Sequence, residues 1–223
     1  MEKIAPKVAI VDYALGNLFS IKHACERVGL NSIITSDKEE ILEADGVLLP
    51  GMGAFGDAMQ TLHKLDLVAV LRDIAASDKP LIGICLGIQL LLSESYEFGH
   101  HKGLGIIEGE VVPLGHPHED GKQLKVPQIG WNQIISARSW DETLLRSIPD
   151  REYMYFVHSY APQPQDADVV LAKTIYGGVE FCSSLRRENI FACLFHPERS
   201  GVMGLKIYEN LASHVGRSLK GFD

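Results

Sequence analysis

A cysteine between two glycines follows a short apolar run and precedes a second apolar stretch. Cys85 has Gly83 and Gly87 two positions away on either side and follows the run 81–84. This spacing is typical of a nucleophile elbow, a sharp strand-to-helix turn that exposes a reactive side chain. The first amides of the following helix favour a thiolate over a thiol, and the N–H of Leu86 could stabilise an oxyanion. The residues thus predict thiol attack on a carbonyl carbon; the alternative is a buried structural cysteine.

A histidine and a glutamate two residues apart could supply the base that a thiol needs. His196 and Glu198 flank Pro197, directly after the apolar run 190–194. Because proline disfavours helical backbone in the residue before it, we expect an extended segment in which His196 and Glu198 share a face. The carboxylate would then fix the tautomer of the imidazole and stabilise its protonated form. The alternative is a surface turn with a solvated glutamate.

Eight other histidines compete for the role of base. His158 ends a predicted strand but has no acid two positions later, so we assign it to the wall of the site or to substrate contact. The others lie in polar turns or on predicted helices without a suitably spaced acid: His23, His63, His100, His101, His116, His118 and His214. We interpret the cluster 116–120 as part of a solvated loop, and we expect neither a metal nor a cofactor.

A glycine-rich segment follows another apolar run. Gly51 and Gly53 surround Met52 in the segment 50–53, directly after the run 46–49. Glycines at such a place let the backbone turn its N–H groups towards a ligand. The segment could therefore supply a second oxyanion donor near Cys85, and a plain tight turn is the alternative.

Alternating strand and helix patterns must position these residues. The pattern predicts strands at 8–11, 32–35, 46–49 and 81–84 with helices between them, one of which covers 57–75. This alternation predicts an α/β fold with an open, mostly parallel, flavodoxin-like sheet flanked by helices. Ligands bind beyond the carboxyl ends of such strands, where the segments 12–17 and 50–56 and Cys85 all lie. Further strand-like runs predict a mixed or antiparallel second half of the same domain, residues 1–223; they lie at 105–112, 131–135, 153–157, 169–173, 179–183 and 190–194. We expect a last helix over about 204–215.

Composition limits the classes of protein. The net charge of −8 argues against general binding to nucleic acid, which favours a basic surface. Four cysteines without paired short spacing indicate neither a zinc site nor a disulfide scaffold. The N-terminus lacks the pattern of a signal peptide, and no apolar run approaches the roughly 20 residues of a membrane span. We therefore expect a cytoplasmic protein that binds neither nucleic acid nor membrane.

The two catalytic segments resemble those of a known family. GICLGIQLL at 83–91 and FHPE at 195–198 are similar to the class I glutamine amidotransferases, which hydrolyse L-glutamine to glutamate and ammonia. Further blocks at 11–13, 16–18, 50–56, 126–127, 130–132 and 155–160 resemble the glutaminase subunit of imidazole glycerol phosphate synthases. These blocks stretch from residue 8 to about residue 210, nearly the whole chain. The resemblance implies the same fold and activity.

The resemblance also implies roles for single residues. Cys85 would be the nucleophile, His196 the general base and then acid, and Glu198 the acid that orients the imidazole. The oxyanion amides would come from Met52, Gly53 and Leu86, and L-glutamine would be bound by Gly51, Gly53, Gln89, Glu97, His158 and Ser159. One departure is Ile88, where the family commonly has methionine, a swap of similar volume that should be tolerated.

A partner and two alternatives complete the expectation. The resemblance implies a heterodimer with a (β/α)₈-barrel cyclase subunit, which uses the ammonia to make imidazole glycerol phosphate and AICAR in histidine biosynthesis. One alternative is a paralogous glutaminase that supplies ammonia for sugar amidation in surface polysaccharide synthesis. The other is a cysteine peptidase or acyl hydrolase of the same fold, which would need neither Gln89 nor the blocks 50–55 and 130–132.

Overall fold

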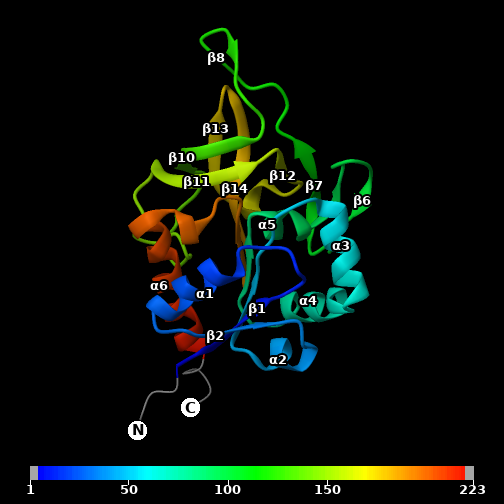
Figure 1. Ribbon diagram of the computed structural model, residues 1–223. Helices are drawn as coiled ribbons and strands as arrows, with labels where there is room; N and C mark the ends of the chain where they lie inside the picture. Colours follow the sequence, from blue (N-terminus) through cyan, green and yellow to red (C-terminus); the bar gives the residue numbers. More distant parts are fainter. Residues whose placement is uncertain (1–4, 219–223) are drawn as a thin grey trace.

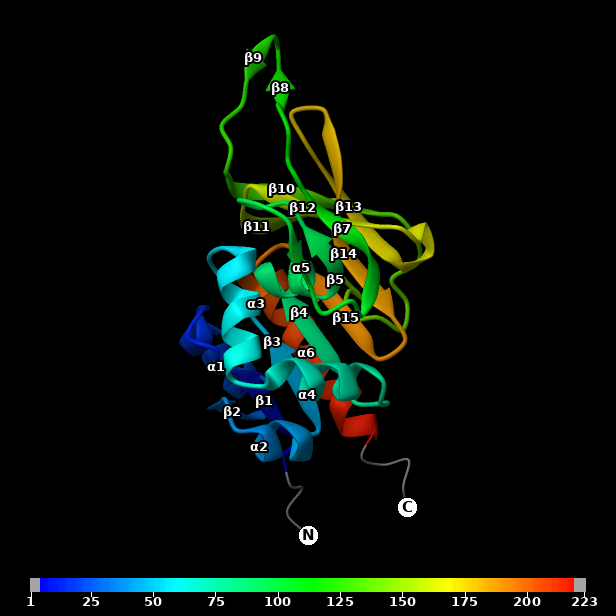
Figure 2. The ribbon, with the colours of Figure 1, turned by 90° about the vertical axis from the view of Figure 1, so that its right-hand side faces the viewer.

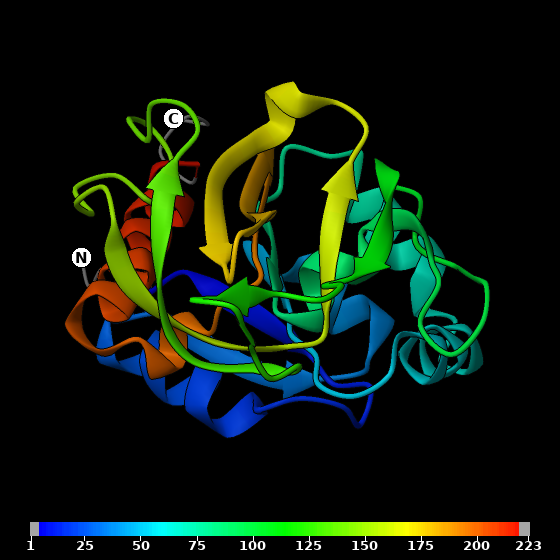
Figure 3. The ribbon, with the colours of Figure 1, turned by 90° about the horizontal axis from the view of Figure 1, so that it is seen from above.

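The four apolar runs of the first half form parallel strands of one sheet. The computed structural model describes residues 5–218. The strands are β1 (Lys7–Val11), β2 (Asn31–Thr35), β3 (Gly46–Leu49) and β4 (Leu81–Ile84), as predicted to within a residue. Strands β3 and β4 are buried throughout because helices cover both faces of this part of the sheet. Figures 1 and 3 show α6 on one side and α3 and α4 on the other.

The helices differ from the predicted ones mainly in where they begin and end. They are α1 (Leu18–Arg27), α2 (Lys38–Glu43), α3 (Phe55–Lys64), α4 (Leu67–Ala75), α5 (Leu86–Leu90) and α6 (Gly201–Ser218). The single helix predicted over 57–75 is wrong, because Asp66 adopts a left-handed conformation with φ of 51°. Such a residue cannot continue a right-handed helix. The break turns the chain so that α4 buries Leu67 and Leu71.

The predicted antiparallel half continues the same sheet. Strands β10 (Gln128–Ser136), β11 (Glu152–His158), β13 (Val170–Tyr176) and β14 (Val179–Arg187) are antiparallel to their neighbours. Strand β14 then pairs with β15 (Ile190–Cys193), which runs parallel to β4. The nine-stranded order is β11-β10-β13-β14-β15-β4-β3-β1-β2. The predicted fold class, a parallel sheet with a mixed second half, is confirmed.

A second sheet lies beside the first and was not predicted. Its order is β12-β7-β5-β6, with β5 (Leu92–Ser95), β6 (His101–Lys102), β7 (Ile107–Pro113) and β12 (Tyr160–Pro164). The sequence pattern missed β12 because Pro162 and Pro164 read as turn residues, although an edge strand tolerates proline. The segment interpreted as a solvated loop forms an exposed hairpin of β8 (His118–Glu119) and β9 (Lys122–Gln123), which projects from the molecule in Figure 2.

The carboxyl ends of the parallel strands meet at one edge of the sheet. The Tyr13 hydroxyl, after β1, donates to the Pro50 carbonyl, after β3, at 2.5 Å. The Cys85 N–H, after β4, donates to the Cys193 carbonyl at the end of β15 at 2.9 Å. These bonds gather the segments 12–17 and 50–56, the cysteine and the histidine segment as predicted. Within residues 5–218, none of the helices combines the length and apolarity needed to cross a membrane.

Candidate active site

Close backbone contacts build the turn that presents Cys85. The cysteine has φ of 55° and ψ of −111°, a sparsely populated conformation for a residue with a β-carbon. A β-carbon at Gly87 would collide with the carbonyl oxygen of Leu49 on β3. One at Gly83 would lie 3.0 Å from the nitrogen of Ile88. Both glycines are therefore required by the close approach of the backbone, and the predicted elbow is confirmed.

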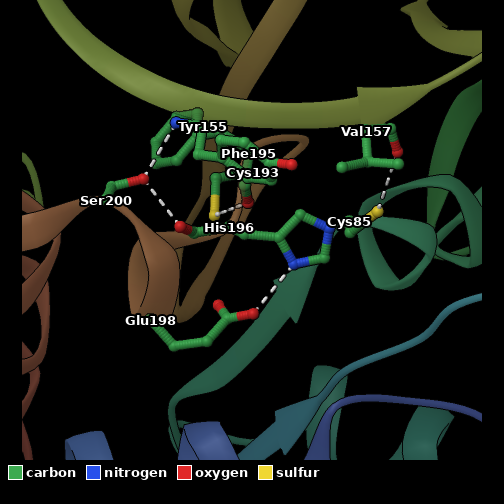
Figure 4. A network of polar contacts seen from close by, with 8 residues as sticks. All are labelled: Cys85, Tyr155, Val157, Cys193, Phe195, His196, Glu198 and Ser200. Carbon is green, nitrogen blue, oxygen red and sulfur yellow. Dashed lines mark hydrogen bonds and ion pairs between the residues drawn. The ribbon is translucent and has the colours of Figure 1, made fainter. Parts of the chain in front are cut away.

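The structure brings the three predicted catalytic side chains together although more than a hundred positions separate the first from the others. Figure 4 shows the imidazole of His196 projecting from the end of β15 towards the side chain of Cys85. On its other side, His196 Nδ1 lies 2.9 Å from Oε1 of Glu198, whose side chain is fully buried. The Cys85 thiol donates to the carbonyl of Val157 at 3.8 Å. A thiol, an imidazole and a carboxylate thus form one chain of contacts.

The backbone that pairs His196 with Glu198 is not the extended segment that we predicted. His196 is extended, but Pro197–Arg199 form a 3₁₀ turn, η2. Proline suits the first position of a helical turn because it has no N–H to leave unpaired. The Arg199 N–H donates to the His196 carbonyl at 3.0 Å, and the Ser200 hydroxyl donates to the same oxygen at 2.6 Å. The pairing of the two side chains therefore comes from a capped turn.

The two buried histidines differ in protonation because their surroundings shift their pKa values in opposite directions. Burial alone would lower the pKa of His196, but the Cys85 sulfur and the Glu198 carboxylate outweigh it and raise this pKa to about 10. Burial lowers the pKa of His158 to about 4, and its ring contacts the Tyr160 carbonyl and the Gln128 side chain. At neutral pH His196 is therefore cationic beside the sulfur, whereas His158 is a neutral wall residue.

A cavity of about 280 Å³ opens at the cysteine. Ten of its lining residues come from five segments of the chain: Met52, Gly53, Cys85, Leu86, Gln89, Glu97, His158, Ser159, Tyr160 and His196. Every predicted site residue lines it except Glu198, which lies behind the imidazole, and Gly51. The latter is buried beneath the loop, where a β-carbon would meet the hydroxyl of Tyr13 and the side chain of Leu86.

Two polar side chains are held in the wall of this cavity. The Gln89 amide donates to the carbonyl of Tyr160 at 3.1 Å, which fixes the direction of its side chain. The half-buried carboxylate of Glu97 accepts the N–H of Phe55 at 2.6 Å. This bond attaches the glycine-rich segment to Glu97 and leaves a negative charge facing the cavity. Such a site can hold a small ligand that carries a cationic group.

The sequence reasoning missed four residues of the cavity wall: Pro127, Val157, Tyr160 and Arg199. Arg199 was open to prediction, because it is a cation next to the histidine–glutamate pair. Its guanidinium lies 5.4 Å from the ring centre of Tyr155. Val157 could not have been found by residue type, since it contributes its carbonyl oxygen.

The arrangement defines a class of protein before any comparison is made. A cysteine on an elbow at the carboxyl edge of a parallel sheet, paired with a histidine and a glutamate from a neighbouring strand end, is the arrangement of an enzyme that attacks carbonyl carbons through a thiolate.

Comparison with known proteins gives the particular family. The sequence model of the family "Glutamine amidotransferase class-I" matches residues 9–214. The chain belongs to this family and is a glutamine amidotransferase with glutaminase activity, so the resemblance seen in its sequence is confirmed.

Similar curated proteins carry one name. The chain is 45% identical over 207 residues to "Imidazole glycerol phosphate synthase subunit HisH" of Aquifex aeolicus (strain VF5), covering 92% of this chain and 95% of that protein. It is 42% identical over 205 residues to "Imidazole glycerol phosphate synthase subunit HisH 1" of Legionella pneumophila (strain Lens), covering 91% and 96%.

Solved structures share the fold at low sequence identity. The structure of PurLQS from Thermotoga maritima superposes with a TM-score of 0.70 at 18% identity, covering 95% of this chain and 99% of that one. A crystal structure of a glutamine amidotransferase gives 0.68 at 18% identity, covering 92% and 98%. At this identity the likeness concerns the fold alone.

Proposed function

We propose that this chain is the glutaminase subunit of an imidazole glycerol phosphate synthase and that Cys85, His196 and Glu198 are its catalytic triad. The subunit would pass ammonia to a (β/α)₈-barrel cyclase that makes imidazole glycerol phosphate and AICAR. The pathway is supported by the shared name of relatives that are 42–45% identical over more than nine-tenths of the chain. The observation that carries the mechanism is the position of His196 between the sulfur of Cys85 and the carboxylate of Glu198. A cytoplasmic location and one domain over residues 1–223 stay part of this proposal.

The first half of the reaction forms a thioester. The thiolate of Cys85 attacks the side-chain amide carbon of L-glutamine, and the carbonyl electrons move onto oxygen. The N–H of Leu86, at the start of α5, has no partner within the helix and can bind this oxyanion together with an amide of the Met52–Gly53 segment. His196 then gives its proton to the departing nitrogen. Ammonia leaves, and a glutamyl thioester with Cys85 remains.

The second half hydrolyses the thioester. His196, now neutral, takes a proton from a water molecule as that water attacks the thioester carbon. The same two amides bind the second oxyanion. When this intermediate collapses, the carbon–sulfur bond breaks, glutamate is released and Cys85 returns as a thiolate beside the protonated imidazole. Glu198 stays ionised throughout and holds His196 in the orientation that both steps need.

The cavity walls suit glutamine in both charge and size. We assign the α-ammonium group to Glu97, whose carboxylate faces the cavity. Ser159 and the fixed amide of Gln89 would contact the polar groups at the other side. Because His158 is neutral and its Nδ1 lies 3.0 Å from the Tyr160 carbonyl, it would form a wall of the cavity and leave acid–base chemistry to His196.

An exposed apolar face beside the cavity suits a partner subunit. On the outer face of β10 and β11, Ile129, Trp131 and Tyr153 are 63%, 54% and 51% exposed. They share one face because they alternate along strands that pair with each other. Apolar side chains gathered in this way are typical of protein interfaces. Pro127, directly before β10, and Val157 on β11 line the cavity wall, so a subunit bound here would lie beside the source of ammonia.

The experiment measures glutamate and ammonia release with and without the cyclase subunit and its ligand. We expect the free chain to be a weak glutaminase and the complex to be faster, because a glycine-hinged turn at 50–53 can rotate one oxyanion amide into place. Loss of one such donor typically costs about 10²–10³ in rate. Equal rates in both states would contradict the coupling. Glutaminase activity without any binding to the cyclase would favour the sugar-amidation alternative.

A further inference from the structure

The hydroxyl of Tyr13 is held beneath the glycine-rich segment that lines the cavity at Cys85. Tyr13 lies in the loop after β1, and its side chain is only 1% exposed. Its hydroxyl donates to the carbonyl of Pro50 at 2.5 Å. Burial and the charge on the Cys85 sulfur both raise the pKa of Tyr13, so the hydroxyl stays protonated and remains a donor.

The same hydroxyl packs against Gly51, the next residue of the segment. A β-carbon at Gly51 would collide with the Tyr13 hydroxyl and would lie 2.8 Å from Cβ of Leu86. Gly51 therefore fits between Tyr13 and the first residue of α5, whose N–H is one of the proposed oxyanion donors. The hydroxyl thus lies at the junction of the two elements that supply the proposed oxyanion amides.

The segment is bonded at its two ends and free between them. Its first carbonyl, that of Pro50, accepts the Tyr13 hydroxyl, and beyond its far end the N–H of Phe55 donates to Glu97. Within residues 5–218, no hydrogen bond involves the backbone of residues 51–53. Gly53 has φ of 106°, a conformation that favours glycine. Rotation of a peptide is therefore easiest between residues 51 and 53.

We propose that Tyr13 is a positioning residue for the oxyanion site: its hydroxyl fixes the peptide between Pro50 and Gly51 and confines rotation to the peptides that follow. A buried carbonyl that loses its donor is costly, so without the hydroxyl this peptide would turn towards another donor. The Met52 or Gly53 amide would then point at the oxyanion in a smaller fraction of molecules. This inference rests on the proposed function in taking one of these two amides as an oxyanion donor.

The test begins with Tyr13→Phe, which keeps the ring and removes only the hydroxyl. Tyr176→Phe is the matched control, because the Tyr176 hydroxyl also donates to a backbone carbonyl, that of Lys125 at 2.9 Å. Replacement of Tyr13 by 4-aminophenylalanine puts an N–H donor in the place of the hydroxyl. A melting curve checks that each variant is folded.

Two kinetic measurements separate the oxyanion site from the rest of the active site. Steady-state kinetics gives kcat and KM for glutamine. The rate of Cys85 alkylation by iodoacetamide reports the reactivity of the sulfur alone, because this attack occurs at a carbon that is not a carbonyl carbon and forms no oxyanion.

We expect Tyr13→Phe to lower kcat by about tenfold, the scale of one lost hydrogen bond. Loss of an oxyanion donor outright costs about 10²–10³, but here the donor still reaches the oxyanion in part of the molecules. KM and the alkylation rate should stay at their wild-type values, since the thiolate and the groups that bind glutamine are unchanged. The 4-aminophenylalanine variant should recover most of the lost kcat, and Tyr176→Phe should match the wild-type chain.

NMR relaxation dispersion, which detects exchange on the microsecond-to-millisecond scale, tests the anchor without any substrate. In the wild-type chain, exchange broadening should be large for the Gly53 amide and small for the Gly51 amide. In Tyr13→Phe it should rise at Gly51. Equal broadening of the two amides in the wild-type chain would overturn the proposal, and this measurement decides the point even if the variant proves unfolded.

Wild-type kcat in folded Tyr13→Phe would also overturn the proposal. A loss of kcat matched by an equal loss of alkylation would do the same, because it would indicate a general distortion of the site. Failure of the proposed function gives a different result. If the wild-type chain released no ammonia from glutamine while broadening at Gly51 rose in Tyr13→Phe, the anchor would stand and the proposed mechanism would fall.

Discussion

Gly87 lies so close to Leu49 that a β-carbon at residue 87 would collide with the Leu49 carbonyl oxygen. Leu49 ends β3, and the segment 50–53 with its proposed oxyanion amides follows it directly. The turn that presents Cys85 is therefore packed against the strand that leads into the segment across the cavity. This backbone contact helps to set the distance between the nucleophile and the loop.

The variant Gly87→Ala tests this contact. The added methyl group must push β3 away from the start of α5, since a backbone carbonyl cannot move aside as a flexible side chain can. We expect a loss of glutaminase activity by about 100-fold or more, because misplaced catalytic groups lose rate steeply. The melting temperature should also fall. Ala58→Gly, at a buried position of α3, is the control for a change of one methyl group in a helix outside the site. Full activity in folded Gly87→Ala would contradict the packing argument.

Removing the sulfur or the imidazole should abolish ammonia release. Cys85→Ala and His196→Ala should each cost nearly the full rate enhancement, because members of one catalytic unit act together. The double variant should be hardly worse than either single one, and steady-state glutamate production measures all three. Additive losses would mean that the two residues act separately. Cys182→Ala, at a buried cysteine on β14, controls for the loss of a thiol outside the site.

The protonation of His196 should depend on Cys85. Burial opposes the charge on the imidazole, whereas the sulfur and Glu198 raise the pKa to about 10 from the ordinary 6.5. A folded-state pKa above the unfolded one adds stability that is complete below about pH 6.5 and is lost as the pH rises through about 10. Denaturant unfolding of the wild-type chain between these limits should therefore show falling stability.

In Cys85→Ala this fall should be smaller, because the strongest cause that raises the pKa of His196 is gone. An NMR titration of the His196 ring in both proteins checks the same point directly. The pKa of His196 should lie lower in the variant than in the wild-type chain. Identical titration curves would show that the sulfur does not stabilise the imidazolium.

Replacing Glu97 should weaken the binding of glutamine more than the chemical step. Glu97→Gln keeps the size of the side chain but removes the charge that we assign to the α-ammonium group. We expect KM to rise by about 10-fold to 100-fold, the range of a lost charge-assisted hydrogen bond, with a smaller change in kcat. Glu94→Gln is the matched control, because Glu94 bonds to exposed His100 on the same segment. A fall in kcat at constant KM would contradict the assignment.

Trp131 should be important for binding the partner subunit. Truncating an aromatic side chain at the centre of an interface commonly costs about 10-fold or more in affinity. We expect Trp131→Ala to raise the Kd for the cyclase subunit accordingly, as measured by calorimetry. Leu42→Ala is the control, since Leu42 is 44% exposed on α2, which lies at the opposite end of the molecule in Figure 1. An unchanged Kd for Trp131→Ala would place the interface elsewhere.

Local patterns in the sequence predicted the parts of this protein in which a short segment sets its own structure. The elbow is one, because glycines two positions before and after a cysteine that follows an apolar run are typical of a sharp strand-to-helix turn. The strands β3 and β4 are another, since a continuous apolar run between turn residues has few alternatives to a buried strand. The pairing of His196 with Glu198 was also predicted, although by an extended segment where the structure has a 3₁₀ turn.

Only the tertiary structure decided which distant groups meet. The neutral state of His158 follows from burial against β10, and the carbonyl of Val157 reaches the sulfur through the register of β11. Residue types determined the chemistry that this chain can perform, because nucleophile, base and acid are properties of side chains. Burial, pairing and the environment of each charge depend on contacts between segments far apart in the chain, and no local pattern contains them.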